Sequence, residues 1–552
     1  MFITFKNYLS NALAFSLLFL VPILHADTYI VTTTSDTGAG SLRQAIIDAN
    51  THVGPNTIVF HIPQTDAGFD AEQGTWTIKP TTQLPTITNT GLVIEGGSQA
   101  MFIGTDTNPF GPEIVLDGSL FPTSYGLTVT ADEVKIWELV INHFANIGNA
   151  IRIEGVVGGE ICGCYIGTNT KGIASASNSY GICITSGSRE VRVFRKDNKP
   201  NIISSNTNCG IEISDSSMNN SIMGNIIGLN RTCDDTLGNG AKNGYGGVFI
   251  SGGSDSNRVI NNLIGGNRHY GIMIYASSGN TISENFIGIS DGWVKSLGNT
   301  YSGVYIITEL TSDKAIGNSI SHNQIGYNGG YGVQIWGAGS HSNRITENAI
   351  SMNQQNGISL LYGGNKSIEH PVIQTATQVN VAGQSSPNST VEVFCDGQNQ
   401  GRFFLGTVTA DGSGNFSLDL NMPPPASNIT ATATDAEGNT SEFSTPIVTR
   451  IEENPIGSAP TVFSLSQNYP NPFNPSTTIQ FQIPVSATVE INIYNTLSQK
   501  VRTLVNGRYD AGIHSIVWDG LDDRGIQSAC GIYAYTMKSA DYRDIKKLIL
   551  LK

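Results

Sequence analysis

Short apolar strands that recur together with an asparagine organise the middle of the chain. The segment Asn262–Gly265 is followed by a glycine and alternating apolar residues at Gly271–Ile274, and this pair of signals recurs from about residue 139 to about residue 361. The recurring asparagines, preceded in the same slot by Cys164, are Asn201, Asn225, Asn262, Asn285, Asn323 and Asn348. Their separations alternate between 23–25 and 37–38 residues. A fixed repeat of about 20 to 50 residues is typical of a stacked fold. Since each unit is too short and too β-rich for a helix pair, we predict a parallel β-helix in which each repeat is one turn of the coil.

Alternation within the repeats predicts which side chains face the interior. Ile272 and Ile274 are expected to point into the coil and Met273 outward, because successive residues of a strand point to opposite faces. Rungs stack about 4.8 Å apart, so equivalent asparagines form a column and hydrogen-bond along it. We expect these asparagines to close turns and to carry no chemistry, and Cys164 to interrupt their ladder.

The long repeats owe their length to inserts at one place, just before the glycine that opens the next strand. These inserts span roughly residues 167–180, 228–246 and 288–302. They should project from one edge of the coil at every second turn, about 10 Å apart. Inserts that recur on one face of a repeat protein often mark the binding face.

The sequence before the first rung contains a helix that we predict to cap the coil. Ser41 is a good helix N-cap, and Gln44 three residues later completes a capping box in front of an amphipathic helix that runs to Asn50. A terminal repeat needs such a closing element. The segment Gly40–Asn50 (GSLRQAIIDAN) also resembles the N-terminal signature of a family of large exported bacterial β-helix proteins.

Two smaller β-rich segments follow the coil, which we expect to span residues 27–368. Residues 371–450 contain strand-like runs with turns at regular spacing, as in a β-sandwich. Their ending, Ala433–Ser444, resembles bacterial Ig-like modules of surface proteins. Residues 451–460 form a linker.

The last segment, residues 461–552, carries the most specific resemblance. It opens with Gln467–Thr477 (QNYPNPFNPST), continues with His514–Gly520 and Gly531–Tyr535, and ends with Lys546–Lys552. This pattern is similar to the C-terminal sorting domain of type IX secretion cargo, an Ig-like sandwich; Cys530 stands where that family usually has serine. The resemblance implies export across the outer membrane, with the type IX machinery as partner, followed by release or surface anchoring.

Composition agrees with an exported all-β protein. Charged residues are only 13% of the 552, glycines number 62, and the net charge is −14. The low charge argues against disorder, and the lack of a basic run argues against nucleic acid as a partner. Residues 1–26 read as a signal peptide, with Lys6 before an apolar run and a cleavage site at Leu24–Ala26. No later stretch is long and apolar enough to predict a transmembrane helix. We therefore expect a protein that is secreted or displayed on the surface of a Gram-negative bacterium.

Seven cysteines, an odd number, leave at least one thiol without an intramolecular partner. We interpret the cysteines as small side chains that pack in the turns of the coil. A disulfide between Cys183 and Cys209, about one turn apart, is an alternative that export permits. We expect no cofactor and no metal site.

Candidate chemistry lies mainly on the insert edge. A polysaccharide lyase needs a cation and a base, and a glycoside hydrolase needs two carboxyl groups. The residues of suitable type along this edge, our candidate catalytic group, are Asp234, Asp235, His269, Asp291 and Lys295. A turn column of Glu284, His322 and Glu347 is a further acid/base candidate, although solvated turn residues explain it as well.

Aromatic residues on the outward side of the coil suit stacking on sugar rings, unless neighbouring inserts cover them. The candidate glycan contacts are Phe249, Tyr270, Tyr275, Trp293, Tyr305 and Trp336. The sequence thus predicts an all-β chain, a right-handed parallel β-helix followed by two Ig-like sandwiches, whose leading function is glycan binding or adhesion. The alternatives are a polysaccharide lyase or glycoside hydrolase that acts at the insert edge, and a structural surface protein.

Overall fold

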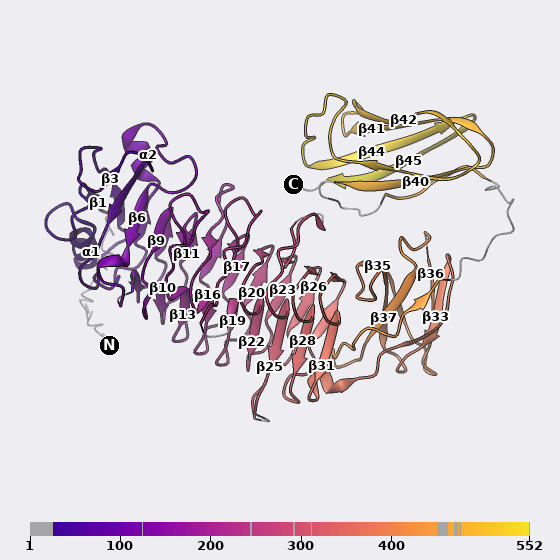
Figure 1. Ribbon diagram of the computed structural model, residues 1–552, viewed down its shortest axis with the longest axis horizontal. Helices are drawn as coiled ribbons and strands as arrows, with labels where there is room; N and C mark the ends of the chain where they lie inside the picture. Colours follow the sequence, from indigo (N-terminus) through magenta and orange to yellow (C-terminus); the bar gives the residue numbers. More distant parts are fainter. Residues whose placement is uncertain are drawn as a thin grey trace, which may run out of the picture.

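The computed structural model describes residues 26–123, 125–242, 245–290, 293–310, 312–420, 422–449, 462–468, 473 and 476–550. The expected signal peptide falls almost entirely outside the described residues. The described chain is all-β: a right-handed parallel β-helix is followed by two antiparallel Ig-like sandwiches (Figure 1), which confirms the predicted fold class. Neither α-helix in the described part of the chain is long and apolar enough to cross a membrane.

Three sheets, named here A, B and C in the order in which the chain visits them, form the described part of the coil. Sheet A contains β1 Thr28–Val31, β2 Thr57–Phe60, β5 Val93–Glu95, β8 Lys135–Trp137, β11 Glu160–Cys162, β14 Arg192–Phe194, β17 Ser221–Met223, β20 Arg258–Ile260, β23 Thr281–Ser283, β26 Ser319–Ser321 and β29 Arg344–Thr346. Sheet B contains β3 Phe69–Asp70, β4 Thr75–Ile78, β6 Ile114–Asp117, β9 Leu139–Asn142, β12 Tyr165–Ile166, β15 Ile202–Ile203, β18 Ile226–Ile227, β21 Leu263–Ile264, β24 Phe286–Ile287, β27 Gln324–Gly326 and β30 Ala349–Ser351. Sheet C contains β7 Leu127–Val129, β10 Asn149–Glu154, β13 Tyr180–Thr185, β16 Cys209–Ile213, β19 Gly246–Ile250, β22 Ile272–Tyr275, β25 Val304–Ile307, β28 Val333–Trp336 and β31 Ile358–Leu361.

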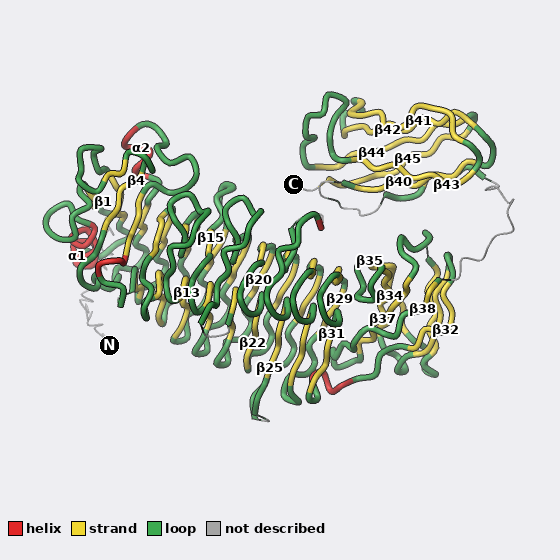
Figure 2. Tube along the Cα trace, viewed as in Figure 1, coloured by secondary structure: helices red, strands yellow, loops and turns green. Residues whose placement is uncertain are grey.

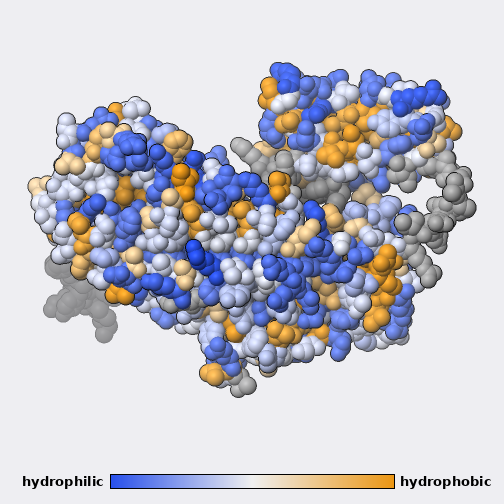
Figure 3. Space-filling view, in the orientation of Figure 1, coloured by the Kyte–Doolittle hydropathy of each residue, from blue (hydrophilic) through white to orange (hydrophobic). Residues whose placement is uncertain are grey.

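The interior of the coil is a continuous apolar column. Equivalent positions stack in register: Ile272 pairs with Val248 below it and with Val304 above it. All three are fully buried, whereas Met273 between the inward positions is only partly buried, as the alternation predicted. On the face seen in Figure 3, hydrophobic residues of the coil are scattered in small groups among polar ones.

Helix α1 (Leu42–Thr51) closes the N-terminal end. Its buried residues Leu42, Ala45, Ile46 and Ala49 join the core of the coil, as its amphipathic pattern predicted. The Ser41 hydroxyl accepts the Gln44 N–H at 3.2 Å, but the Gln44 side chain donates to Asp48, so only half of the expected capping box forms. The other described helices are α2 Ser98–Ile103 and the 3-10 turns η1 Gly118–Leu120 and η3 Gly364–Ser367.

Asparagine ladders run along all three corners of the coil, where the sequence had indicated one. The predicted ladder lies between sheets A and B, and Asn262 Nδ2 donates to Asn285 Oδ1 at 3.0 Å in it. A second ladder between sheets C and A consists of Asn220, Asn257, Asn280, Asn318, Asn343 and Asn365. A third between sheets B and C consists of Asn178, Asn206, Asn239, Asn267, Asn299, Asn328 and Asn353. Each amide satisfies its neighbour, which is what allows so many polar side chains to be buried.

Cys164 joins the ladder that it was expected to interrupt. Its backbone N–H donates to Asn201 Oδ1 at 2.9 Å, and its thiol lies 3.4 Å from the carbonyl of Cys162. All seven cysteines are free. A Cys183–Cys209 disulfide does not form, because the strand register pairs Cys209 with Tyr180 and Cys183 with Glu212.

The first Ig-like sandwich is docked on the last rung of the coil (Figure 2). Its strands are β32 Val372–Ala376, β33 Asn380–Gln384, β34 Thr390–Asp396, β35 Phe403–Thr409, β36 Asn415–Asp419, β37 Asn428–Thr434 and β38 Ile447–Val448. It supplies acceptors to the final strand of each sheet: Thr440 to Ile345, Gly401 to Ile350 and Glu442 to Leu360. The sandwich therefore caps an edge that would otherwise expose unpaired backbone groups.

The second sandwich has its own apolar core around Trp518 and Tyr535. Its strands are β39 Ser464–Leu465, β40 Thr477–Ile483, β41 Ala487–Asn495, β42 Lys500–Tyr509, β43 Gly512–Trp518, β44 Gly531–Ser539 and β45 Tyr542–Leu550. Parts of the resembling motif, including residues 469–472, lie outside the described residues.

Candidate functional sites

The inserts fold back as tight hairpins at the corner between sheets B and C. Isolated bridges close them, such as Leu229 with Thr236 and Ile289 with Ser296. Asp234 and Asp235 lie at the tip of one hairpin. Hydrogen bonds from the Thr232 hydroxyl and the Asn230 amide lower the pKa of Asp234, so this carboxylate is engaged in its own turn. Asp235 accepts the N–H of Thr236 in the same way.

The remaining catalytic candidates of this edge have separate surroundings. The ring of His269 packs against Tyr301 at 5.1 Å between centroids, and burial lowers the pKa of the imidazole. Lys295 is exposed and affects Asp234 through its charge. Asp291 lies outside the described residues. The contacts of the described candidates thus engage Asp234 and Asp235 in their own hairpin and place His269 among tyrosines.

The outward face of sheet C carries the predicted aromatic residues, partly covered by other tyrosines. Tyr245 stacks on Phe249 with centroids 4.2 Å apart, and Tyr270 stacks on Tyr305 at 4.6 Å. As a result Phe249 and Tyr305 are each only 7% exposed. Tyr275 is half-buried. The covering rings present their own faces outward in place of the strand residues.

The two tryptophan candidates lie farther along the coil. Arg402, from the first Ig-like sandwich, lies 4.8 Å from the centroid of the Trp293 ring. Trp336 packs on the exposed ring of Tyr362 at 3.9 Å. Trp293 therefore contacts the capping module, and Trp336 belongs to a separate aromatic pair.

A shallow depression of about 540 Å³ lies on sheet C beside the Tyr245–Phe249 stack. Polar groups line it together with rings: Arg152, Cys183, Thr185, Glu212, Ser214, Asp215, Tyr245, Phe249, Ser251, Gly252 and Tyr275. Burial raises the pKa of Glu212, whose carboxylate lies 3.3 Å from the Cys183 thiol. The depression thus combines aromatic faces with hydrogen-bonding groups of both charges.

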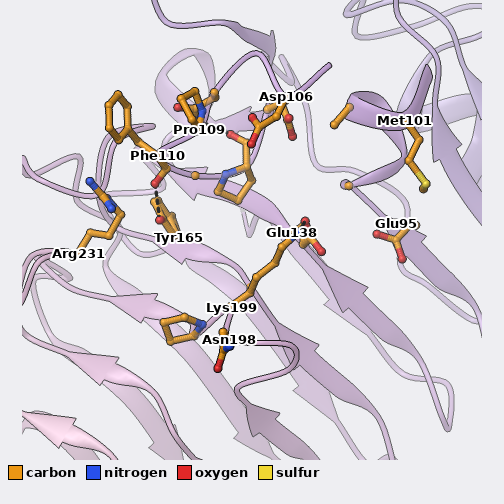
Figure 4. A pocket seen from close by; sticks show the side chains of 18 of the residues that line it. Glu95, Met101, Asp106, Pro109, Phe110, Glu138, Tyr165, Asn198, Lys199 and Arg231 are labelled. Atoms are coloured by element: carbon orange, nitrogen blue, oxygen red, sulfur yellow. Dashed lines mark hydrogen bonds and ion pairs between the residues drawn. The ribbon is translucent and has the colours of Figure 1, made fainter. Parts of the chain in front are cut away.

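A larger groove, about 770 Å³, lies on the outside of sheet B among the irregular early rungs (Figure 4). One wall is the long connection 96–113 between β5 and β6, which contains α2. The other is the connection 195–201 between β14 and β15. Between these walls, tight turns at Glu138 and Gly163 form the floor. The two walls belong to the first and fourth of successive rungs, so they stand about 14 Å apart, and Arg231 lines the groove from the fifth rung.

Charges of both signs line this groove. The acidic residues are Glu95, Asp106, Glu113 and Glu138, and the basic ones are Arg195, Lys199 and Arg231. Lys199 Nζ lies 2.6 Å from Glu138 Oε2. Burial alone would lower the pKa of Lys199, but the hydrogen bond and the charge of Glu138 outweigh it and raise this pKa.

The carboxyl groups of the groove differ in their environment. Burial raises the pKa of Glu113 to about 7, and Asp106 and Glu138 add to the increase through their charges. Burial and the charge of Glu138 also raise the pKa of Glu95. A group that holds its proton near neutral pH beside an ion-paired carboxylate can serve in acid/base chemistry.

Sequence reasoning did not find this groove. Most of its residues come from irregular connections, so no repeat spacing relates Glu95, at the end of β5, to Lys199 or Arg231. One signal was available: Glu138 directly precedes the slot of the ladder asparagines and has a left-handed φ of 53°, like Glu284, His322 and Glu347. Of that turn column, His322 and Glu347 form an exposed pair at 2.8 Å.

Three segments of the chain match family models, each covering less than half of it. Residues 369–449 match a bacterial Ig domain, residues 230–359 match a family described as periplasmic copper-binding protein (NosD), and residues 471–542 match a FlgD Ig-like domain. Comparison with curated proteins finds no match.

Among the described residues, the segment matched to the copper-binding description contains no cluster of metal-ligating side chains. Copper prefers imidazole and sulfur ligands. Within the described part of the chain, no group of three or more His, Cys, Asp or Glu is placed to hold a metal ion. Cys233 has its pKa raised to about 11, by burial and by Asp234, and His269 packs against tyrosines.

Solved structures similar to this chain are distant. The A-module of the mannuronan C-5 epimerase AlgE4 of Azotobacter vinelandii is 13% identical, covers 61% of this chain and 98% of its own, with a TM-score of 0.34. ORF18 of Geobacillus virus E2 is 11% identical over 76% of each chain, with a TM-score of 0.39. The Dettilon tailspike protein is 12% identical over 93% of this chain and 92% of its own, with a TM-score of 0.32. At this level of similarity they say nothing about what this chain binds.

Proposed function

We propose that the protein is an exported glycan-binding protein that holds a polysaccharide against the outer face of sheet C. The observation that carries this proposal is the depression in which Tyr245, Phe249 and Tyr275 lie beside Arg152, Glu212 and Asp215. Sugar rings present apolar C–H faces and polar rims, and aromatic side chains with polar neighbours suit both.

The long parallel sheet supports a ligand that extends beyond one sugar. Beyond the depression, Tyr270, Tyr301 and His269 continue the aromatic surface toward the insert corner, with centroids 5.1–6.5 Å apart. A chain of sugars lying across several rungs would contact several of these aromatic rings in succession. Tyr270 contributes directly in this arrangement, whereas Tyr305 and Phe249 support the rings above them.

Glycan retention tests the proposal. Residues 27–552 are applied to a glycan array and to immobilised polysaccharides, and Tyr275→Ala is expected to weaken retention about tenfold. Leu497→Ala is the control, because Leu497 is 77% exposed but lies in the second Ig-like sandwich, outside the coil. Equal retention of both variants, or no retention of the unmodified protein, would contradict glycan binding and favour a structural surface protein.

Export rests on the N-terminal segment and on the second sandwich. The signal peptide would bring the chain to the periplasm, and the sandwich would direct it through the type IX machinery to the cell surface or the medium. Deletion of residues 461–552 in the producing bacterium is expected to leave the protein in the periplasm, as measured by fractionation and immunoblotting. Unchanged surface or extracellular amounts would contradict this route.

A further inference from the structure

Two carboxylates of the sheet B groove face the same small space above Gly97. A methyl group at Gly97 would lie 2.8 Å from Oε2 of Glu138 and 3.2 Å from Oε1 of Glu95. Glycine therefore keeps this space open. Lys199 holds Glu138 from the opposite wall of the groove at 2.6 Å. The ion pair holds the Glu138 carboxylate in place next to this open space.

A third carboxyl group of the groove supplies a proton donor. Glu113 lines the groove although it is only 4% exposed, and its pKa near 7 keeps much of it protonated at neutral pH. Asp106, exposed on the connection 96–113, is close enough to hydrogen-bond with it. The groove thus contains a proton donor and a proton acceptor at once.

The end of the groove near Arg231 has the features of a sugar-binding surface. The Phe110 ring is 45% exposed, and the guanidinium of Arg231 lies 5.1 Å from its centroid. Tyr165 donates to the Phe110 carbonyl at 2.5 Å and fixes the loop, which is seen at one end of Figure 4, with Glu95 and Met101 at the other. Asn108, 2% exposed, lines the groove with an Oδ1 that accepts no hydrogen bond among the described residues.

We propose that this groove hydrolyses glycosidic bonds of a polysaccharide, with Glu113 as general acid and Glu138 as general base. The site lies on sheet B, away from the depression on sheet C, and goes beyond glycan binding there. Two carboxyl groups in one groove, one to donate a proton and one to accept it, are what acetal hydrolysis requires.

The reaction balances with water as the second substrate. Glu138 takes a proton from a water molecule, whose oxygen forms a new bond to the anomeric carbon. The bond from that carbon to the leaving sugar oxygen breaks, and Glu113 donates its proton to this oxygen. One chain becomes two, one of them with a new reducing end, and solvent returns Glu113 and Glu138 to their starting protonation states. Phe110 and Arg231 bind the neighbouring sugars.

New reducing ends measure this activity. Residues 27–552 are incubated with amylose, xylan, β-1,3-glucan, alginate and polygalacturonate. At least one is expected to yield new reducing ends, at a rate that falls as the pH rises through about 7, since Glu113 then loses its proton. Glu113→Gln and Glu138→Gln are each expected to lower this rate at least about 100-fold.

The matched control is Glu284→Gln, an exposed glutamate of the same turn column outside the groove, which should keep the full rate. Thermal unfolding verifies that each variant is folded. No new reducing ends from any polysaccharide, or full rates in Glu113→Gln and Glu138→Gln, would overturn the proposal. Glycan retention without hydrolysis contradicts this proposal alone, and hydrolysis without an effect of Tyr275→Ala on retention contradicts the sheet C proposal alone.

Discussion

Gln400 of the first Ig-like sandwich extends the asparagine ladder that ends at Asn353. Gln400 Oε1 accepts from the backbone N–H and from Nδ2 of Asn353, at 3.0 and 3.1 Å, and Gln400 Nε2 donates back to the Asn353 carbonyl at 2.8 Å. The side chain amide thus takes the place that the next asparagine of the coil would occupy. The module is therefore a structural cap in addition to being a domain of its own.

Removal of this amide should destabilise the junction. Gln400→Ala removes the acceptor of the buried Asn353 N–H and the donor to the carbonyls of Asn353 and Gln355, and we expect it to lower the free energy of unfolding by about 2 kcal/mol. Urea denaturation followed by intrinsic fluorescence measures this. Gln398→Ala is the control, since Gln398 is exposed and only its backbone is hydrogen-bonded. Equal stability of the two variants would show that the module does not cap the coil through Gln400.

Removal of an asparagine from the middle of a ladder should lower the free energy of unfolding by more than Gln400→Ala does. Asn262→Ala removes an acceptor for both N–H groups of Asn225, together with the bonds from Asn262 to Asn285 and Ile222. We expect a cost of about 3 kcal/mol and faster amide hydrogen exchange in the adjacent rungs. The neighbouring Asn261→Gly should cost little, because Asn261 is exposed and has a left-handed φ of 54° that glycine adopts readily. A uniform exchange pattern in Asn262→Ala would contradict the ladder's role.

Cys164 occupies a position of the ladder that asparagine holds in the later rungs. Introducing an asparagine there tests the ladder by adding an amide instead of removing one. Its thiol accepts the Leu139 N–H and points at the Ile136 carbonyl, in the way that Asn201 points at the Ile161 carbonyl. Cys164→Asn should therefore fold with a melting temperature equal to or above that of the unmodified protein, whereas Cys164→Ala should lower it by several degrees. If asparagine destabilised the coil more than alanine did, the slot would not be part of the ladder.

Glu113 should make stability depend on pH. The folded state keeps this proton up to about pH 7 and the unfolded state releases it near pH 4.5, so between these values the folded state binds more protons. Stability therefore falls as the pH rises through this window and levels off above it, by up to about 3 kcal/mol. Glu113→Gln removes this dependence, and its melting temperature should exceed that of the unmodified protein increasingly from pH 5 to pH 7. Parallel melting curves across pH 4–9 would contradict the raised pKa.

The sequence by itself determined the coil. The alternating separations of the asparagines predict rungs of two lengths, and the inward isoleucines such as Ile272 and Ile274 follow from a period of two. The helix after Ser41 also follows from local pattern, since its N-cap and its apolar face lie within ten residues. These features are predictable because the residues that make each contact are near in the chain or separated by one repeat.

Tertiary structure decided what the repeat does not encode. The groove brings together Glu95, Glu138, Lys199 and Arg231 from connections of unequal length, and no period relates them. Tyr245, from an insert, covers Phe249, and Tyr270, from a short turn, covers Tyr305, because these side chains reach across to the strands. Gln400 caps Asn353 because the last rung leaves donors that a separate domain satisfies. Because the rungs stack, residues separated by one repeat come into contact, and such contacts can be predicted from the sequence. Residues of irregular loops have no such spacing, and only the folded coil brings them together.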